Sequence, residues 1–193
     1  METWKSFFTQ SLTEKVDISN LIQLINDFSL TFIGEKHRSE GPIFDNELCL
    51  IKSFDPQTVQ IGFEHPESSP LTQRLNNYTP LPITNGIKQG QNEPYFSFFD
   101  RYESKMLELI LKSLNKNNKK SLIIVGEDHL RPTSGIPYKK ELADVPRVII
   151  YQKTEDYYPH IAKLKDGVYN LSVDESHPSY KKAKIFLIKG SLR

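Results

Sequence analysis

Two short motifs place a glutamate and a histidine directly after an apolar run. The segments Gly34–His37 and Gly126–His129 both read Gly-Glu-x-His, and each follows four consecutive residues that are mostly apolar. With 9 glycines and 5 histidines in 193 residues, chance would supply only about 0.2 matches to Gly-x-x-His. Carboxylate and imidazole side chains exchange protons or bind metals near neutral pH. The doubled motif therefore predicts a site that combines acids with histidines.

The apolar runs before the motifs predict the place of this site. Leu30–Ile33 and Leu122–Val125 are typical of short buried strands closed by a glycine turn. A further strand predicted at Thr58–Phe63 ends in Glu64 and His65. The carboxyl ends of parallel strands form one edge of a sheet, the rim, where ligands of open α/β sheets bind. We therefore expect these strand ends to converge.

The backbone after each glycine decides where the side chains point. Glycine permits a positive φ or a close approach of other groups. If the chain stays extended past the glycine, residues two apart point the same way, so Glu35 would face the site with His37, and Glu127 with His129. Together with the acid of the Thr58–Phe63 strand, the predicted catalytic and metal-binding set is Glu35, His37, Glu64 and His129.

Two kinds of chemistry fit this set. Neutral imidazoles and carboxylates suit a divalent metal such as manganese, zinc, cobalt or iron, which lowers the pKa of a bound water to about 7. Crowding of Glu35, Glu64 and Glu127 would favour such a cation. The alternative is metal-free catalysis, in which Glu35 accepts a proton while a histidine stabilises developing charge. Three further residues are weaker candidates for the site: His65, Glu127 and Arg131.

The remaining sequence indicates an α/β domain over residues 1–193. Apolar spacing predicts a helix near 18–28, another that begins at Pro42, and a third from Asp100, where Asp100 and Glu103 resemble a capping box. Alternation of these helices with strands favours a mostly parallel sheet covered on both faces. Residues 66–99 are rich in proline and predict an irregular insertion. Strands at 167–173 and 185–188 would form an antiparallel edge pair.

The composition limits the partners and the compartment. With 25 basic and 24 acidic residues the net charge is +1, so we expect no nucleic-acid partner. No apolar stretch reaches the length of a membrane span, and charges interrupt every candidate signal peptide. Cys49 cannot form an internal disulfide and is expected to be a buried thiol. We expect a cytoplasmic protein, or one that is exported without a recognisable Sec signal.

The order of these motifs resembles a known superfamily. A strand with Gly-x-x-His, an acid at a later strand end, and a second strand with Gly-x-x-His is similar to the Tiki-type proteases, TraB proteins, ChaN-type haem-uptake proteins, erythromycin esterases and a domain of large bacterial toxins. The match spans about residues 30 to 150. The resemblance implies that Glu35, His37, Glu64 and His129 belong to the active or binding site. Asp128 and Glu127, in contrast, replace the small residues usual in the second motif.

Three functions remain open at this stage. The leading hypothesis is metal-assisted hydrolysis of a peptide or ester bond, with a peptide or small molecule as substrate. The first alternative, which the ChaN resemblance implies, is binding of haem or another tetrapyrrole at the same rim. The second alternative is a bacterial effector or toxin domain that acts by contact with a host protein.

Overall fold

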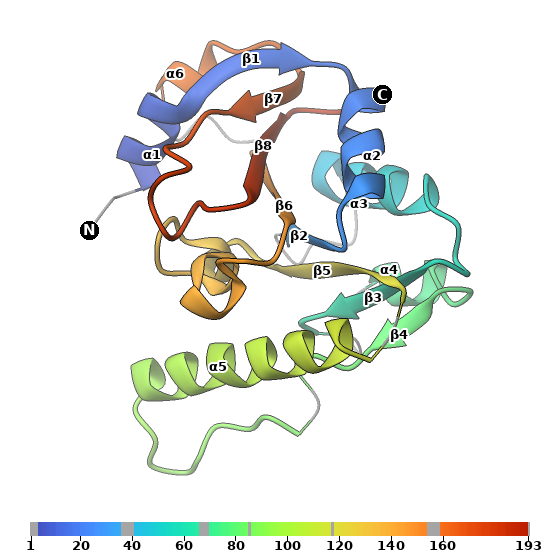
Figure 1. Cartoon of the computed structure of the whole chain (residues 1–193), viewed down its shortest axis with the longest axis vertical. Coiled ribbons are helices and arrows are strands. Elements are labelled where there is room, and N and C mark those ends of the chain that lie inside the picture. Colours follow the sequence, from blue (N-terminus) through green and yellow to red (C-terminus); the bar gives the residue numbers. More distant parts are fainter. Residues whose placement is uncertain are drawn as a thin grey trace.

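One eight-stranded sheet organises the chain (Figure 1). The computed structural model describes residues 4–35, 41–65, 70–84, 86–116, 118–153 and 159–192. The strand order is β1-β7-β8-β6-β2-β5-β3-β4, and all neighbours from β8 to β4 pair in parallel. The predicted α/β class with a mostly parallel sheet is confirmed. The strands are β1 Leu12–Val16, β2 Leu30–Glu35, β3 Val59–Phe63, β4 Thr79–Leu81, β5 Lys120–Gly126, β6 Arg147–Lys153, β7 Gly167–Leu171 and β8 Ala183–Lys189.

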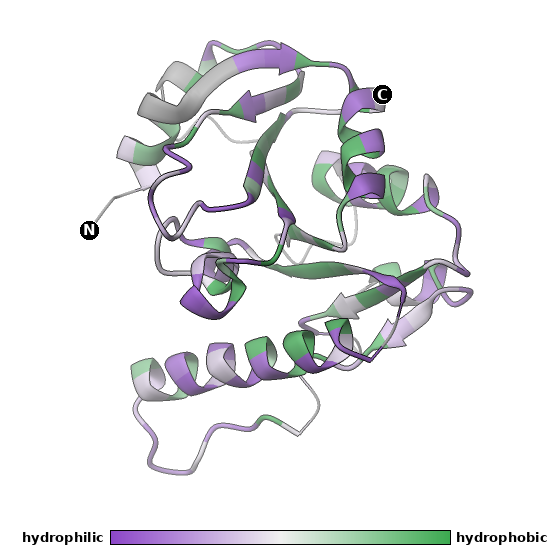
Figure 2. Ribbon diagram, viewed as in Figure 1, coloured by the Kyte–Doolittle hydropathy of each residue, from purple (hydrophilic) through white to green (hydrophobic). Residues whose placement is uncertain are grey.

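Helices cover both faces of this sheet, as the sequence predicted. One apolar cluster joins the sheet to α2, α3 and α4, and a second joins the opposite face to α1, α5, α6 and the short 3-10 helices η1 to η3. Figure 2 shows the matching pattern, with hydrophobic residues along β5 and alternating turns of hydrophobic and hydrophilic residues on α5. The helices are α1 Trp4–Ser11, α2 Ile18–Asp27, α3 Pro42–Lys52, α4 Pro70–Arg74, α5 Tyr95–Leu114, η1 Glu127–Leu130, η2 Ile136–Tyr138, η3 Lys140–Leu142 and α6 Pro159–Ala162.

At the centre of the sheet, the connections that follow β2 and β5 lead toward opposite edges. Strands β2 and β5 pair in register from Leu30 opposite Ser121 to Glu35 opposite Gly126. The chain leaves β2 through α3 on one face, whereas it leaves β5 through η1 to η3 on the other. In open α/β sheets ligands bind outside the carboxyl ends of strands at such a switch point. The two Gly-x-x-His motifs begin at this position.

The edges of the sheet differ in part from the prediction. Strands β7 and β8 pair antiparallel, as predicted, but β8 also pairs in parallel with β6 and is therefore internal. The edge strand on this side of the sheet is β1, which pairs antiparallel with β7. This strand is not predicted from the sequence, because Leu12–Val16 follows a helix directly and carries two charges in five residues.

The described part of the segment 66–99, residues 70–84 and 86–99, is less irregular than predicted. It contributes α4 and the short edge strand β4, where Pro80 is tolerated because an edge strand has one side without ladder hydrogen bonds. Helix α5 begins at Tyr95, directly after Pro94, and not at Asp100. Asp100 and Glu103 therefore lie inside the helix, and the predicted capping box is wrong. Cys49, expected to be buried, is exposed on α3.

Candidate functional site

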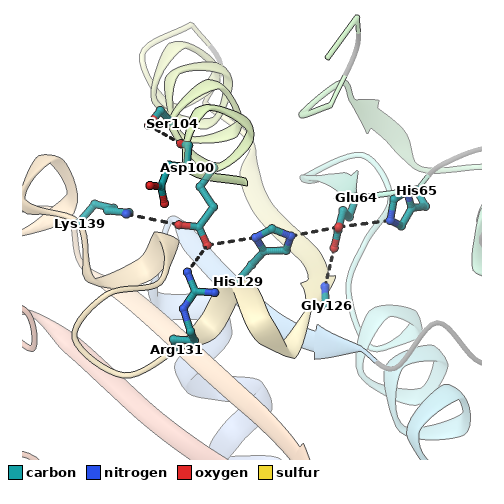
Figure 3. Close-up of polar contacts among 9 residues, drawn as sticks. Glu64, His65, Asp100, Ser104, Gly126, His129, Arg131 and Lys139 are labelled. Atoms are coloured by element: carbon teal, nitrogen blue, oxygen red, sulfur yellow. Dashed lines mark hydrogen bonds and ion pairs between the residues drawn. The ribbon is translucent and has the colours of Figure 1, made fainter. Parts of the chain in front are cut away.

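A row of polar side chains runs along the α5 side of the rim (Figure 3). At the end of β3, Glu64 receives a hydrogen bond on Oε2 from the backbone N–H of Gly126, at 2.7 Å. Its Oε1 lies 3.0 Å from Nε2 of His129 and 3.2 Å from Nε2 of His65. The adjacent strand ends β3 and β5 thereby hold one carboxylate between two imidazoles.

The other side of His129 contacts an acid that the sequence did not assign to the site. Nδ1 of His129 lies 3.1 Å from Oε1 of Glu103, which projects from α5. Glu103 is fully buried, and His129 is only 3% exposed. Both ring nitrogens of His129 therefore face carboxylate oxygens in the protein interior.

Two cations and one aromatic ring complete the surroundings of Glu103 and His129. Arg131 donates from Nη2 to Oε1 of Glu103 at 3.2 Å, and Nζ of Lys139 lies 3.3 Å from Oε2. The ring of Phe99 stacks on the His129 ring with centroids 4.7 Å apart, and the Arg131 guanidinium lies 4.8 Å from the Phe99 centroid. The buried acid thus has three positively charged or protonatable neighbours.

The network determines which groups are charged. Burial alone would lower the pKa of His129, but the hydrogen bonds and charges of Glu103 and Glu64 raise it to about 9. Burial would likewise raise the pKa of Glu64, yet His129, the Gly126 N–H and His65 lower it to about 2. At neutral pH His129 is therefore an imidazolium that donates to two carboxylates.

The second motif reaches this arrangement through a turn and not through extended chain. Residues after Gly126 form η1, a 3-10 helix in which positions three apart lie on the same side. A Cβ on Gly34 would lie 3.0 Å from Cδ1 of Leu130 and 3.2 Å from Cγ of Glu127, so both residues pack over β2. His129 consequently points away from Glu127, and the expected pairing of these two side chains is wrong. Gly34 allows this close approach with no positive φ.

The first motif places its acid on the opposite face of the sheet. Ile33 packs in the cluster of α2 and α3, and Glu35, two residues further along β2, projects to the same face. There Glu47 on α3 is buried, and burial raises its pKa. The nearby charge of Glu35 raises it further, to about 9. Gln152 Nε2 donates to Oε1 of Glu47 at 3.0 Å and to the Gly34 carbonyl at 2.8 Å. The structure therefore does not bring Glu35 to the side of Glu64 and His129.

Replacing Glu47 by glutamine should stabilise the protein at pH 7 by about 3 kcal/mol. The folded state keeps a proton on Glu47 that the unfolded chain releases above its ordinary pKa of 4.5, so folding stability falls as pH rises from about 4.5 to 9. Urea unfolding at pH 7 measures the gain, and at pH 4.5 the gain should nearly vanish. Glu141→Gln, an exposed substitution, should change neither value; an equal effect of both variants would contradict the assignment.

The predicted site residues thus have different outcomes. Glu64 and His129 lie together, and His65 and Arg131, the weaker candidates, both join them. Glu127 packs over Gly34 instead. His37 lies outside the described residues. The sequence did not predict Glu103 as a site residue. Its spacing to Met106, Leu107 and Ile110 was a usable signal, because it puts an acid on the apolar side of a helix.

Among the described residues, His129 is not placed to bind the predicted metal or haem. Both nitrogens of His129 face carboxylates, so neither is available as a ligand in this arrangement. Within the described ranges no group of three or more His, Cys, Asp and Glu side chains is arranged to hold a metal ion. A metal or haem site that uses His37 stays a prediction.

Comparisons with known proteins add little to these observations. No family model matches the sequence, and no curated protein matches it. Among solved structures, the chain is similar to the type III effector HopBA1, with a TM-score of 0.44 and 12% identity over 90% of this chain and 93% of that chain. Among the helices that the structure describes, none is long and apolar enough to cross a membrane.

Proposed function

We propose that the rim site hydrolyses an ester or peptide bond by acid and base catalysis centred on His65 and Glu64. The observation that carries this proposal is the continuous row Glu103, His129, Glu64 and His65, which leads from a fully buried acid to an imidazole whose side chain is 50% exposed. A carboxylate that is held in place and bonded to a half-exposed imidazole is the arrangement that general base catalysis uses.

The contacts support a division of roles. His65 accepts a proton from the attacking water, and the Glu64 carboxylate stabilises the imidazolium that forms. The water oxygen bonds to the carbonyl carbon, and the proton then passes to the leaving alcohol or amine as its bond to that carbon breaks. His129 and the Gly126 N–H fix the Glu64 carboxylate, because together they occupy both of its oxygens. His129 is therefore a positioning residue and does not itself transfer the proton.

The test is hydrolysis of a panel of 4-nitrophenyl esters and fluorogenic peptides by the purified protein. His65→Ala should lower kcat/KM by about 100-fold, the usual size of a lost acid or base, and His177→Ala, at another exposed histidine, should not. Circular dichroism checks that both variants fold. No turnover by the wild type, or equal kcat/KM in the wild type and His65→Ala, would overturn the proposal.

A metal-dependent mechanism would give a different result in the same assay. If a metal bound through His37 carries the reaction, as the sequence predicted, dialysis against a chelator should abolish turnover and added manganese or zinc should restore it. Under the proposal made here the chelator leaves turnover unchanged. Contact with a host protein stays a prediction.

A further inference from the structure

Tyr102 on α5 carries a hydroxyl that the row of polar contacts does not use. Within the described part of the chain this hydroxyl has no hydrogen-bond partner. The hydroxyls of Tyr78, Tyr151 and Tyr169, in contrast, each donate to a backbone carbonyl at 2.7 to 2.9 Å. A side chain that is mostly buried and leaves its donor unused is uncommon in folded proteins and calls for an explanation.

The Tyr102 hydroxyl reaches solvent although its ring is packed. Tyr102 is 7% exposed, and the centroid of its ring lies 5.4 Å from that of Phe98 and 5.8 Å from that of His129. Described side-chain oxygens that lack both solvent contact and a hydrogen bond include Oγ1 of Thr31 and of Thr72, but not the Tyr102 hydroxyl. The O–H group is therefore a donor on a fixed ring that a bound molecule can contact.

Electrostatics places this hydroxyl at the Glu64 end of the row. Burial raises the pKa of Tyr102, and the charge of Glu64 raises it further. The charge of Glu103, the other acid at His129, makes no such contribution, although Glu103 is the next residue of the helix. The hydroxyl therefore lies nearer to the Glu64 carboxylate, which contacts Nε2 of His65 at 3.2 Å, than to the Glu103 carboxylate.

Hydrolysis needs a donor at the carbonyl oxygen of the substrate, and the contacts described above do not supply one. When the oxygen of water bonds to the carbonyl carbon, the π electron pair moves onto the carbonyl oxygen, which becomes negative. The Gly126 N–H and the His129 imidazolium cannot stabilise this charge, because both already donate to Glu64. A preorganised O–H group at the developing charge is one of the groups that enzymes use for this purpose.

We propose that the Tyr102 hydroxyl donates a hydrogen bond to the carbonyl oxygen of the substrate while that oxygen is negative. The proposal rests on the hydrolytic function above and adds a catalytic residue to it. Tyr102 keeps its proton throughout, because its pKa is raised, and the electron pair returns to the carbonyl as the leaving group departs. The charge of Glu64 does not cancel this effect, because His65 has by then accepted a proton from water and pairs with Glu64 as an imidazolium.

Tyr102→Phe removes only the hydroxyl and keeps the packed ring. For 4-nitrophenyl butyrate, kcat should fall about 100-fold with an unchanged KM, because the donor acts on the carbonyl oxygen only when that oxygen is charged. Tyr169→Phe, on a strand that four other strands separate from β3, should leave kcat unchanged. The urea midpoint of Tyr102→Phe should match that of the wild type, since no hydrogen bond within the described chain is lost, whereas Tyr78→Phe should lower the midpoint.

Binding of butylphosphonate tests the donor without any turnover, because its tetrahedral anionic head resembles the charged intermediate. In NMR titrations Tyr102→Phe should raise the Kd of butylphosphonate about tenfold, the usual cost of one hydrogen bond to a charged group. The Kd of butyramide, which is neutral and planar at its carbonyl, should stay nearly unchanged.

The outcomes separate the two proposals. Binding of butylphosphonate that depends on Tyr102, without hydrolysis, supports the donor and overturns the hydrolytic function. Hydrolysis with the same kcat in the wild type and Tyr102→Phe supports the function and overturns the role of Tyr102. A lower urea midpoint in Tyr102→Phe, or an affinity for butylphosphonate that does not change, would also overturn that role, because the hydroxyl would then not act on a bound anion.

Discussion

Glu103→Gln should lower the free energy of unfolding by about 3–5 kcal/mol, the usual cost of removing one partner from a buried ion pair. Glu103 is fully buried and faces His129, Arg131 and Lys139. The amide that replaces it keeps the size of the side chain but not the charge, so these cations lose their compensation. Urea denaturation measures this change. It is carried out at pH 6, because His129 is protonated in the native state at that pH.

A matched control lies on the same helix. Glu108 pairs with Lys105 on the exposed side of α5, with side chains 61% and 45% exposed. Surface pairs of this kind contribute little, so Glu108→Gln should leave the free energy of unfolding nearly unchanged. If Glu103→Gln were as mild as Glu108→Gln, the buried network would not stabilise the fold, and the charge assigned to His129 would be wrong.

Deprotonation of His129 should by itself lower the free energy of unfolding by about 3 kcal/mol between pH 6.5 and pH 9. Because the pKa of His129 is raised on folding, its contribution to the free energy of unfolding is complete below 6.5, the pKa in the unfolded chain. That contribution is lost as pH rises through about 9, the pKa in the folded state. The lowered pKa of Glu64 acts at the other end, since its contribution is complete above 4.5 and is lost as pH falls through about 2. The network is therefore at full strength from about pH 4.5 to 6.5.

The measurement must separate His129 from Glu47, because Glu47 also lowers stability as pH rises from 4.5 to 9. Chemical denaturation of Glu47→Gln across this range isolates the histidine. In that background His129→Gln should flatten the decline above pH 6.5, whereas His177→Gln, at an exposed histidine, should leave it unchanged. A decline that persists in His129→Gln would show that other groups titrate.

The spacing of glycine, glutamate and histidine was sufficient to locate the rim. Together with the apolar runs it identified β2, β3 and β5, which end at Glu35, Phe63 and Gly126, because buried parallel strands are short apolar runs closed by a turn. Parallel pairing then brings such strand ends to one edge whatever the rest of the chain does. Glu64 and His129, 65 residues apart in the chain, meet for this reason.

Only the tertiary structure decided which face of the sheet each side chain occupies and what lies behind it. Glu35 is the last residue of β2 and projects toward α3. The 3-10 turn after Gly126 instead rotates His129 toward α5. Such a turn depends on packing over Gly34, which no local sequence pattern specifies. Glu103 shows the same limit. Its place on the apolar side of α5 is visible in the spacing, but its partner is fixed by how that helix packs on the sheet.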